Sequence, residues 1–244
     1  MKKAISLNKL FVLALFILCN TVYAQEAEVS SVIVFSKTAA YRHQSIEIGL
    51  EALKKLGIDN NFLVDATEDA DTLIKNLNNY KVVVFLSTSG DIFNENQQKA
   101  FKKYIENGGG FVGIHAATDT EYDWPWYGKL IGAYFAGHPK QQDAVINIVN
   151  HDHKATSFLG DTWHKFDEWY NYKQIRSNIN VLMTLDETSY SGGKNGENHP
   201  ISWFHEHEGG RVFHTGLGHT KESYTDETFL KHILGGILYT MKKD

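Results

Sequence analysis

The chain has 244 residues, a formal net charge of −5, one cysteine and 12 histidines. Its acidic balance, 29 Asp and Glu against 24 Lys and Arg, argues against a nucleic-acid partner and against binding to anionic membranes. One cysteine excludes a disulfide framework, so the fold must be stabilised by a packed core, which a chain of this length can bury as one domain.

Residues 1–24 have the pattern of a secretory signal peptide. Three lysines lie within the first nine residues, an apolar run covers 10–19, and small side chains precede an expected cleavage after Ala24. Cleavage leaves residues 25–244 as a single domain with 21 basic and 29 acidic residues, a net charge of −8. The predicted location is the periplasm or the cell exterior.

An alternative interpretation of the same segment is a lipoprotein signal with Cys19 as the acylated residue. It is disfavoured because Leu18 is large, whereas that cleavage site requires a small residue before the cysteine. The apolar run is also too short to span a bilayer stably, so no membrane span is expected after cleavage.

The first half of the mature chain alternates strand-like and helix-like segments. The runs VVVFL and GFVGI have no polar face, which is typical of strands inside a parallel sheet. The predicted order is strand 31–35, helix 45–56, strand 62–64, helix 67–77, strand 82–86, helix 94–107 and strand 110–115. This alternation predicts an α/β fold with a doubly wound, mostly parallel sheet.

The second half predicts additional strands and loops on the same sheet. Its apolar patterning indicates a helix over 127–135, strands over 144–149, 166–172, 181–185, 201–206 and 211–215, a polar loop over 187–198 and a closing helix over 226–241.

Three of the predicted strands are followed by a histidine: His43, His115 and His219. Ligands of open α/β sheets bind beyond the carboxyl ends of the strands, so these imidazoles are candidates for one site. His115 lies between the small residues Gly113 and Ala117, as the central residue of a nucleophile elbow does. An imidazole there suits acid–base chemistry, metal ligation or ligand binding. The alternative is a structural histidine held by backbone carbonyls.

Carboxylates alternate with aromatic residues in two segments. The first runs from Asp119 through Trp124 to Tyr127, and the second contains Glu168 beside Trp169. Carbohydrate sites combine ring faces with carboxylates in this way, although such segments also serve as ordinary packing.

Two further histidines, His138 and His199, precede prolines, which restrict their backbone to extended conformations. A metal site built from His43, His115 and His219 is geometrically feasible, and a divalent metal therefore stays open as a cofactor. The i,i+2 pairs at 205 and 207 and at 151 and 153 could form surface metal clips, the latter being more typical of a solvated loop. No nucleotide cofactor is expected.

The order of motifs resembles the ThuA-like, trehalose-utilisation family over nearly the whole mature chain. The motifs that carry the resemblance are RHQSI at 42–46, GGGFVGIHAATDT at 108–120, YDWPWY at 122–127, GHP at 137–139, DEWY at 167–170, NHPI at 198–201 and GLGHT at 216–220.

This resemblance implies a flavodoxin-like, class I glutamine amidotransferase-like fold. In the amidotransferases the elbow carries a catalytic cysteine, whereas His115 occupies that position here, so amidotransferase chemistry is not expected. The family is associated with the use of trehalose and related disaccharides through 3-keto derivatives, and secreted members are often labelled glycosyl hydrolases.

Together these observations predict a carbohydrate-active enzyme whose substrate is a disaccharide or its 3-keto derivative. His115 is the expected general acid or base, and Asp119 or Glu168 its carboxylate partner. The expected substrate-binding residues are His43, Trp124, His138, His199 and His219. Isomerisation or elimination is favoured over hydrolysis, which requires two carboxylates across the bond.

Two alternatives stay open. One is a non-catalytic carbohydrate-binding or accessory protein, and the other is a metal-binding or structural protein. Homo-oligomerisation is not decided by the sequence.

Overall fold

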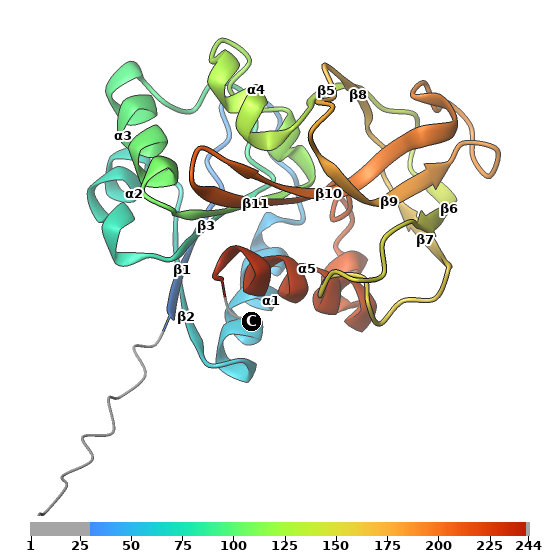
Figure 1. Cartoon of the computed structure of the whole chain (residues 1–244), viewed down its shortest axis with the longest axis horizontal. Coiled ribbons are helices and arrows are strands. Elements are labelled where there is room, and N and C mark those ends of the chain that lie inside the picture. Colours follow the sequence, from blue (N-terminus) through green and yellow to red (C-terminus); the bar gives the residue numbers. More distant parts are fainter. Residues whose placement is uncertain (1–29, 243–244) are drawn as a thin grey trace, which may run out of the picture.

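The computed structural model describes residues 30–242 (Figure 1). The predicted signal peptide, the cleavage after Ala24 and the alternative lipidation at Cys19 lie outside these residues. The described residues form a sheet of nine strands in the order β2-β1-β3-β4-β11-β10-β9-β6-β7, with a separate sheet of two strands, β5 and β8.

Five neighbouring strands form the parallel half of the large sheet. They are β2 (Phe62–Thr67), β1 (Ser30–Phe35), β3 (Val82–Leu86), β4 (Gly110–Ile114) and β11 (Gly210–Thr215). Every neighbouring pair among them is parallel. This is the strand order of a flavodoxin-like sheet. The predicted doubly wound α/β architecture is confirmed.

Helices cover both faces of the parallel half (Figure 1). One face packs against α1 (Ile46–Asp59) and α5 (Glu227–Thr240), and the other against α2 (Ala70–Asn76), α3 (Glu95–Glu106) and α4 (Pro125–Ile131). Side chains alternate between two cores because successive strand residues point to opposite faces: Val82, Val84 and Leu86 join one core, and Val83 and Phe85 the other. Among residues 30–242, no helix combines the length and apolarity that crossing a bilayer would need.

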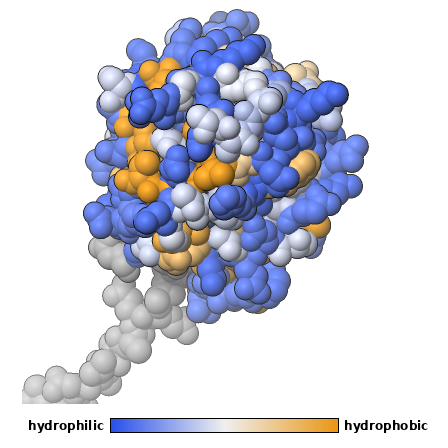
Figure 2. Space-filling model, turned by 90° about the vertical axis from the view of Figure 1, so that its right-hand side faces the viewer, coloured by the Kyte–Doolittle hydropathy of each residue, from blue (hydrophilic) through white to orange (hydrophobic). Residues whose placement is uncertain are grey.

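The remaining four strands form the antiparallel half of the sheet. They are β10 (His199–His207), β9 (Asn180–Asp186), β6 (Gln142–Ile148) and β7 (Thr162–Asp167). Each is antiparallel to its neighbours. Figure 2 shows the end of the molecule where these strands lie, a largely hydrophilic surface with small apolar patches. The additional strands predicted for the second half of the chain therefore extend the sheet at one edge.

The helix predicted over 127–135 was wrong at its C-terminal end. α4 stops at Ile131, and Tyr134–Gly137 forms strand β5. Gly132 ends the helix because its φ is 99°, a left-handed conformation that glycine adopts without strain, and because a Cβ at this position would lie 2.6 Å from Nε1 of Trp203. The apolar residues after it belong to a strand.

The single strand predicted over 166–172 was also wrong. β7 ends at Asp167 and pairs with β6, whereas β8 (Asn171–Lys173) pairs with β5 in the small sheet. Residues 168–170 connect β7 to β8 and belong to neither strand. The Asp167 carboxylate accepts hydrogen bonds from backbone N–H groups of its own segment and of a distant loop, which holds the chain in this bend.

Candidate functional site

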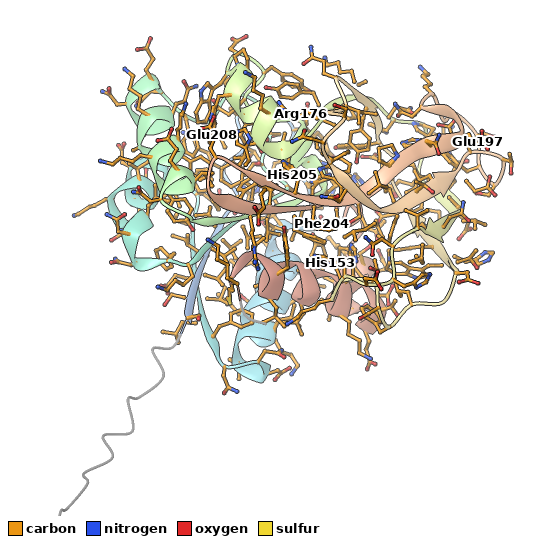
Figure 3. The ribbon with its side chains drawn as sticks, viewed as in Figure 1. His153, Arg176, Glu197, Phe204, His205 and Glu208 are labelled. Carbon is orange, nitrogen blue, oxygen red and sulfur yellow. The ribbon has the colours of Figure 1, made fainter. Side chains whose placement is uncertain are left out.

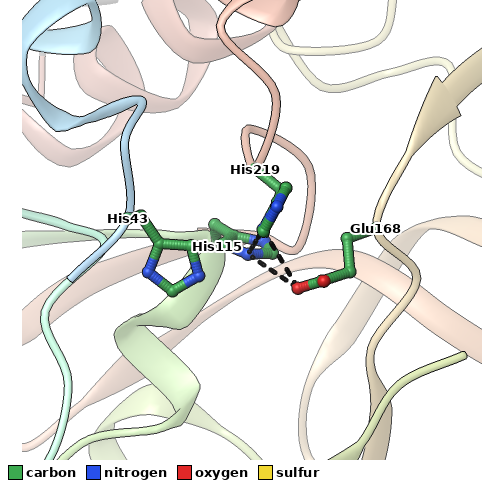
Figure 4. Close-up of side chains that lie close together, drawn as sticks. All are labelled: His43, His115, Glu168 and His219. Carbon is green, nitrogen blue, oxygen red and sulfur yellow. Dashed lines mark hydrogen bonds and ion pairs between the residues drawn. The ribbon is translucent and has the colours of Figure 1, made fainter. Parts of the chain in front are cut away.

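Three histidines meet at the carboxyl edge of the parallel half. His43 lies in the segment after β1, His115 directly follows β4, and His219 lies in the loop after β11. Glu168 joins them from the bend after β7, in the antiparallel half. The structure brings these histidines together, as the parallel topology predicts: one ligand atom from each of the four residues lies within 4.8 Å of all the others (Figure 4).

His115 occupies a sharp bend at the end of β4. Its φ is 51°, an uncommon value for a residue with a side chain, and a 3-10 turn follows directly. Small neighbours make this bend feasible: a Cβ on Gly113 would lie 2.6 Å from Cδ1 of Ile131. The imidazole is fully buried. Nδ1 lies 2.9 Å from the carbonyl oxygen of Gly216, and Nε2 lies 3.1 Å from Nδ1 of His219.

The loop that contains His219 is held by the buried carboxylate of Asp167. This carboxylate accepts hydrogen bonds from the N–H groups of Gly218 at 2.9 Å, His219 at 3.1 Å and Thr220 at 3.3 Å. It also accepts one from the hydroxyl of Ser223 at 3.0 Å. Several donors on one carboxylate fix the backbone, and thereby the direction of the His219 ring.

Glu168 supplies the one carboxylate of the cluster. Oε2 lies 3.0 Å from Nδ1 of His219 and 3.5 Å from Nε2 of His115, and Oε1 lies 3.1 Å from Nδ1 of His138. Burial by itself raises the pKa of this carboxyl, but the hydrogen bonds with His115 and His219 together outweigh burial and hold the pKa well below its usual range. Glu168 is therefore ionised at neutral pH.

His43 closes the cluster on the side of β1. Its ring contacts the rings of His115 and His219 edge to face, with centroid distances of 4.7 and 5.1 Å. Nδ1 is buried and has no hydrogen-bond partner within residues 30–242. Burial, reinforced by the neighbouring His115 and His219, lowers the pKa of His43 to about 2. The imidazole is therefore neutral, with a lone pair available.

A cavity of about 760 Å³ adjoins the cluster. His219 is the cluster member that lines it, and Gln141, which also lines it, places its amide 2.7 Å from Nε2 of the same ring. The other lining residues come from the segment after β1, from β7 and from the loop before α5: Tyr41, Gln44, His164, Lys165, Phe166, Thr220, Lys221, Glu222 and Asp226. The volume lies in the range of small-molecule sites.

Four of the predicted site residues lie outside the four-residue cluster. His138 contacts it through Glu168 and is 41% exposed. Asp119 accepts a hydrogen bond from the Tyr122 hydroxyl at 2.7 Å, and burial raises the pKa of its carboxyl. Trp124 stacks on Trp126 with ring centroids 4.7 Å apart and is half-buried against the core, directly before α4.

His199, the fourth, is fully buried and serves the scaffold. Its Nδ1 lies 2.8 Å from Oε1 of Glu187, and its Nε2 lies 2.8 Å from the carbonyl oxygen of Tyr170. Both ring nitrogens are therefore used to hold the start of β10 against the segment after Glu168.

The structure adds three residues that sequence reasoning did not select. Gln141 contacts His219, the ring of Tyr170 lies 4.4 Å from that of His115, and Asp167 holds the His219 loop. Asp167 and Tyr170 lie in the same DEWY motif as Glu168, so the motif could have indicated both residues. Gln141 lies in a loop without any pattern that marks it.

Comparisons with known proteins gave one family match and several solved structures with the same fold. The model of the ThuA family, described as trehalose utilisation, matches residues 31–240. No curated protein matches the chain. A ThuA-like protein from Bacteroides uniformis aligns over 90% of this chain and 94% of its own, with 23% identity and a TM-score of 0.75.

Two further solved structures share the fold at lower similarity. A ThuA-like protein from Parabacteroides merdae is 20% identical, with 87% of this chain and 90% of that chain covered and a TM-score of 0.72. A β-galactosidase from Bacillus circulans is 13% identical, with 87% of this chain but 30% of that chain covered and a TM-score of 0.55. At these identities the similarity establishes the fold.

Proposed function

The chain belongs to the ThuA family of trehalose utilisation, a carbohydrate-related role, and from this premise we propose that it is an enzyme acting on a disaccharide or its 3-keto derivative. The observation that supports the proposal is the convergence of three imidazoles and one carboxylate beside a cavity of about 760 Å³. These four side chains face one another. His115 also contacts the carbonyl oxygen of Gly216, but its second ring nitrogen faces His219 and Glu168.

The composition of the cluster favours chemistry next to a keto group over hydrolysis of an ordinary glycoside. Simple glycoside hydrolysis uses two carboxylates that flank the bond, and Glu168 is the one carboxylate in this group. A 3-keto group makes the adjacent C–H acidic, so that isomerisation or elimination requires a positioned base and a group that stabilises the developing oxyanion.

The geometry also suggests a division of roles. His219 lines the cavity and contacts the other members, so we assign it the contact with the sugar. Glu168 and His138 form the pair through which a proton would be accepted and released. His115 has no exposed surface, and its part in the proton transfer would therefore run through His219 and Glu168.

The proposal is tested by incubating the protein with trehalose, other disaccharides and their 3-keto forms, each with and without added divalent metal ions. Mass spectrometry and NMR would detect new products, and in D₂O the carbon next to the keto group would incorporate deuterium. Conversion of at least one substrate is expected. If the sugars bind but remain unchanged across the whole panel, the protein is a binding module.

His219→Gln, with His164→Gln as its control, locates the reaction at the cluster. Both histidines line the cavity, but only the first belongs to the four-residue cluster. His219→Gln is expected to lower kcat at least 100-fold, in line with the loss of an acid–base group, whereas His164→Gln retains most of the activity. Equal activity of the two variants would place the chemistry elsewhere.

We further propose that residues 1–24 are a signal peptide and that the protein acts in the periplasm or outside the cell. The basis is the order of basic, apolar and small residues before Gln25. Intact-mass analysis of the protein from the culture medium and the periplasm is expected to give a chain that begins at Gln25. A lipidated chain beginning at Cys19, or an uncleaved chain in the cytoplasm, would contradict this proposal.

A further inference from the structure

Three of the atoms in the cluster form a compact triangle. Nε2 of His115, Nδ1 of His219 and Oε2 of Glu168 are separated by 3.1, 3.0 and 3.5 Å. Donors of a four-coordinate ion with bond lengths of about 2.0–2.1 Å are about 3.3 Å apart. The spacing of the triangle thus matches the edges of a coordination polyhedron without any movement of the backbone.

Contacts on the outer side of the cluster would direct lone pairs into this triangle once the protons shared with Glu168 are displaced. Nδ1–H of His115 donates to the carbonyl oxygen of Gly216, which leaves a lone pair on Nε2. The amide of Gln141 faces Nε2 of His219, and in the orientation that places its oxygen there it accepts N–H from that nitrogen and leaves a lone pair on Nδ1. His138 supports the other oxygen of Glu168.

We propose that His43, His115, Glu168 and His219 bind one divalent first-row transition-metal ion. Without an ion, ring N–H groups hydrogen-bonded to Glu168 hold the triangle together. A cation at its centre would displace these protons and be attracted to the lone pairs that they leave. His43 supplies the fourth donor, within 4.8 Å of the others. Three imidazoles and one carboxylate are ligands suited to Zn²⁺, Co²⁺, Ni²⁺, Fe²⁺ or Mn²⁺, whereas Mg²⁺ and Ca²⁺ prefer oxygen ligands alone.

The position of the cluster is that of an open site, accessible to a further ligand. His219 is 15% exposed and Glu168 7% exposed, and the first lines the cavity. An ion there would polarise the oxygen of a keto or hydroxyl group that enters the cavity. His138, which contacts Glu168 from outside the ligand set, stays available to exchange a proton.

Metal binding is tested on the protein purified without a histidine tag and treated with EDTA. Titration calorimetry with ZnCl₂ and MnCl₂ and metal analysis after dialysis are expected to give one ion per chain, and MgCl₂ is expected not to compete. A melting temperature that rises on addition of Zn²⁺ would accompany binding. The inference is overturned if no ion binds stoichiometrically, which would indicate that protons hold the cluster together instead.

Matched variants locate the ion. Glu168→Gln and His219→Gln each remove one ligand with little change of volume, and His164→Gln removes an exposed imidazole of the same cavity. The first two are expected to weaken binding at least 100-fold, and the third less than threefold. Unchanged affinity in Glu168→Gln and His219→Gln would overturn the assignment.

The absorption spectrum of Co²⁺ provides a readout that does not require the variants to fold. Intense visible bands are expected from four- or five-coordinate Co²⁺ in the unsubstituted protein, and the weak bands of the six-coordinate aqua ion would contradict the site. Because all these measurements are made without sugar, the metal site can be rejected while the proposed carbohydrate activity stands, and the activity can be rejected while the metal site stands.

Discussion

His115 adopts a backbone conformation that residues with a side chain occupy at a cost. Its φ of 51° places the ring at the rim of the sheet, between strands β4 and β11. Such strain persists when the surrounding packing and hydrogen bonds determine the conformation, as Gly113 and the carbonyl of Gly216 do here. The position of the imidazole is thus set jointly by the backbone bend and by the contact of Nδ1 with the carbonyl oxygen of Gly216.

Two substitutions at His115 separate this strain from the function of the ring. His115→Gly and His115→Ala both remove the imidazole, but glycine relieves the left-handed conformation. We expect the glycine variant to be more stable than the alanine variant by about 1 kcal/mol, with both lacking activity. Urea unfolding of the two proteins measures the difference. Equal stabilities would mean that the bend is not strained.

Asp167 is the residue that we expect to matter most for the geometry of the site without contacting the sugar. Asp167→Asn replaces an acceptor-only group with one that directs an NH₂ at backbone donors. The expected loss of unfolding free energy is about 2–3 kcal/mol. Activity is also expected to fall, because the His219 loop would be displaced. Asp152→Asn, on an exposed turn, is the control and is expected to change neither quantity.

At the scale of elements, local patterns predicted the parallel half well. The helix predicted over 94–107 is α3 with its two caps, because Asn94 and Gln97 form a capping box that is visible in the sequence. The bend at 168–170 could not be predicted, since it depends on hydrogen bonds between Asp167 and a loop about fifty residues away. Alternating apolar residues look the same whether a strand continues or changes sheets.

The same limit explains which site residues could be foreseen. Histidines after the strands were predictable because the topology of a parallel sheet brings strand ends together. The separation of Trp124 and His199 from the cluster was not. Trp124 stacks on Trp126 in its own motif, and His199 contacts Glu187 and the carbonyl of Tyr170, and no sequence pattern signals these contacts.

The C-terminal end of α4 offers a test at this scale. Gly132→Ala introduces a Cβ at a φ of 99° against the ring of Trp203, so we expect a loss of about 2 kcal/mol. Gly160→Ala is the matched control, because its Cβ would meet no atom within 4 Å. Thermal unfolding of both variants measures the difference. A harmless Gly132→Ala would show that another residue ends the helix.

At the scale of the whole molecule, the buried histidines make the unfolding free energy depend on pH. His205 and His153 lie on opposite sides of β10, and the ring of His153 packs against Phe204 (Figure 3). Burial lowers the pKa of His153, His205 and His232 from 6.5 to about 4. These rings are neutral in the folded protein at a pH where the unfolded chain would protonate them.

The unfolding free energy is therefore expected to fall as the pH decreases from 6.5 towards 4. In that window the unfolded state binds more protons, so each of these three histidines contributes a slope of up to about 1.4 kcal/mol per pH unit, which levels off below pH 4. Urea unfolding between pH 7 and 4.5 measures the slope. His232→Gln should reduce it and His151→Gln, on the surface, should not.

One oxygen of Asp167 receives the N–H groups of both Glu168 and His219, at 2.9 and 3.1 Å. The backbones of Glu168 and His219 are thus fixed by the same carboxylate, that of Asp167. Glu168 follows a strand of the antiparallel half, and His219 follows a strand of the parallel half. A change that displaced Asp167 would therefore disturb Glu168 and His219 together.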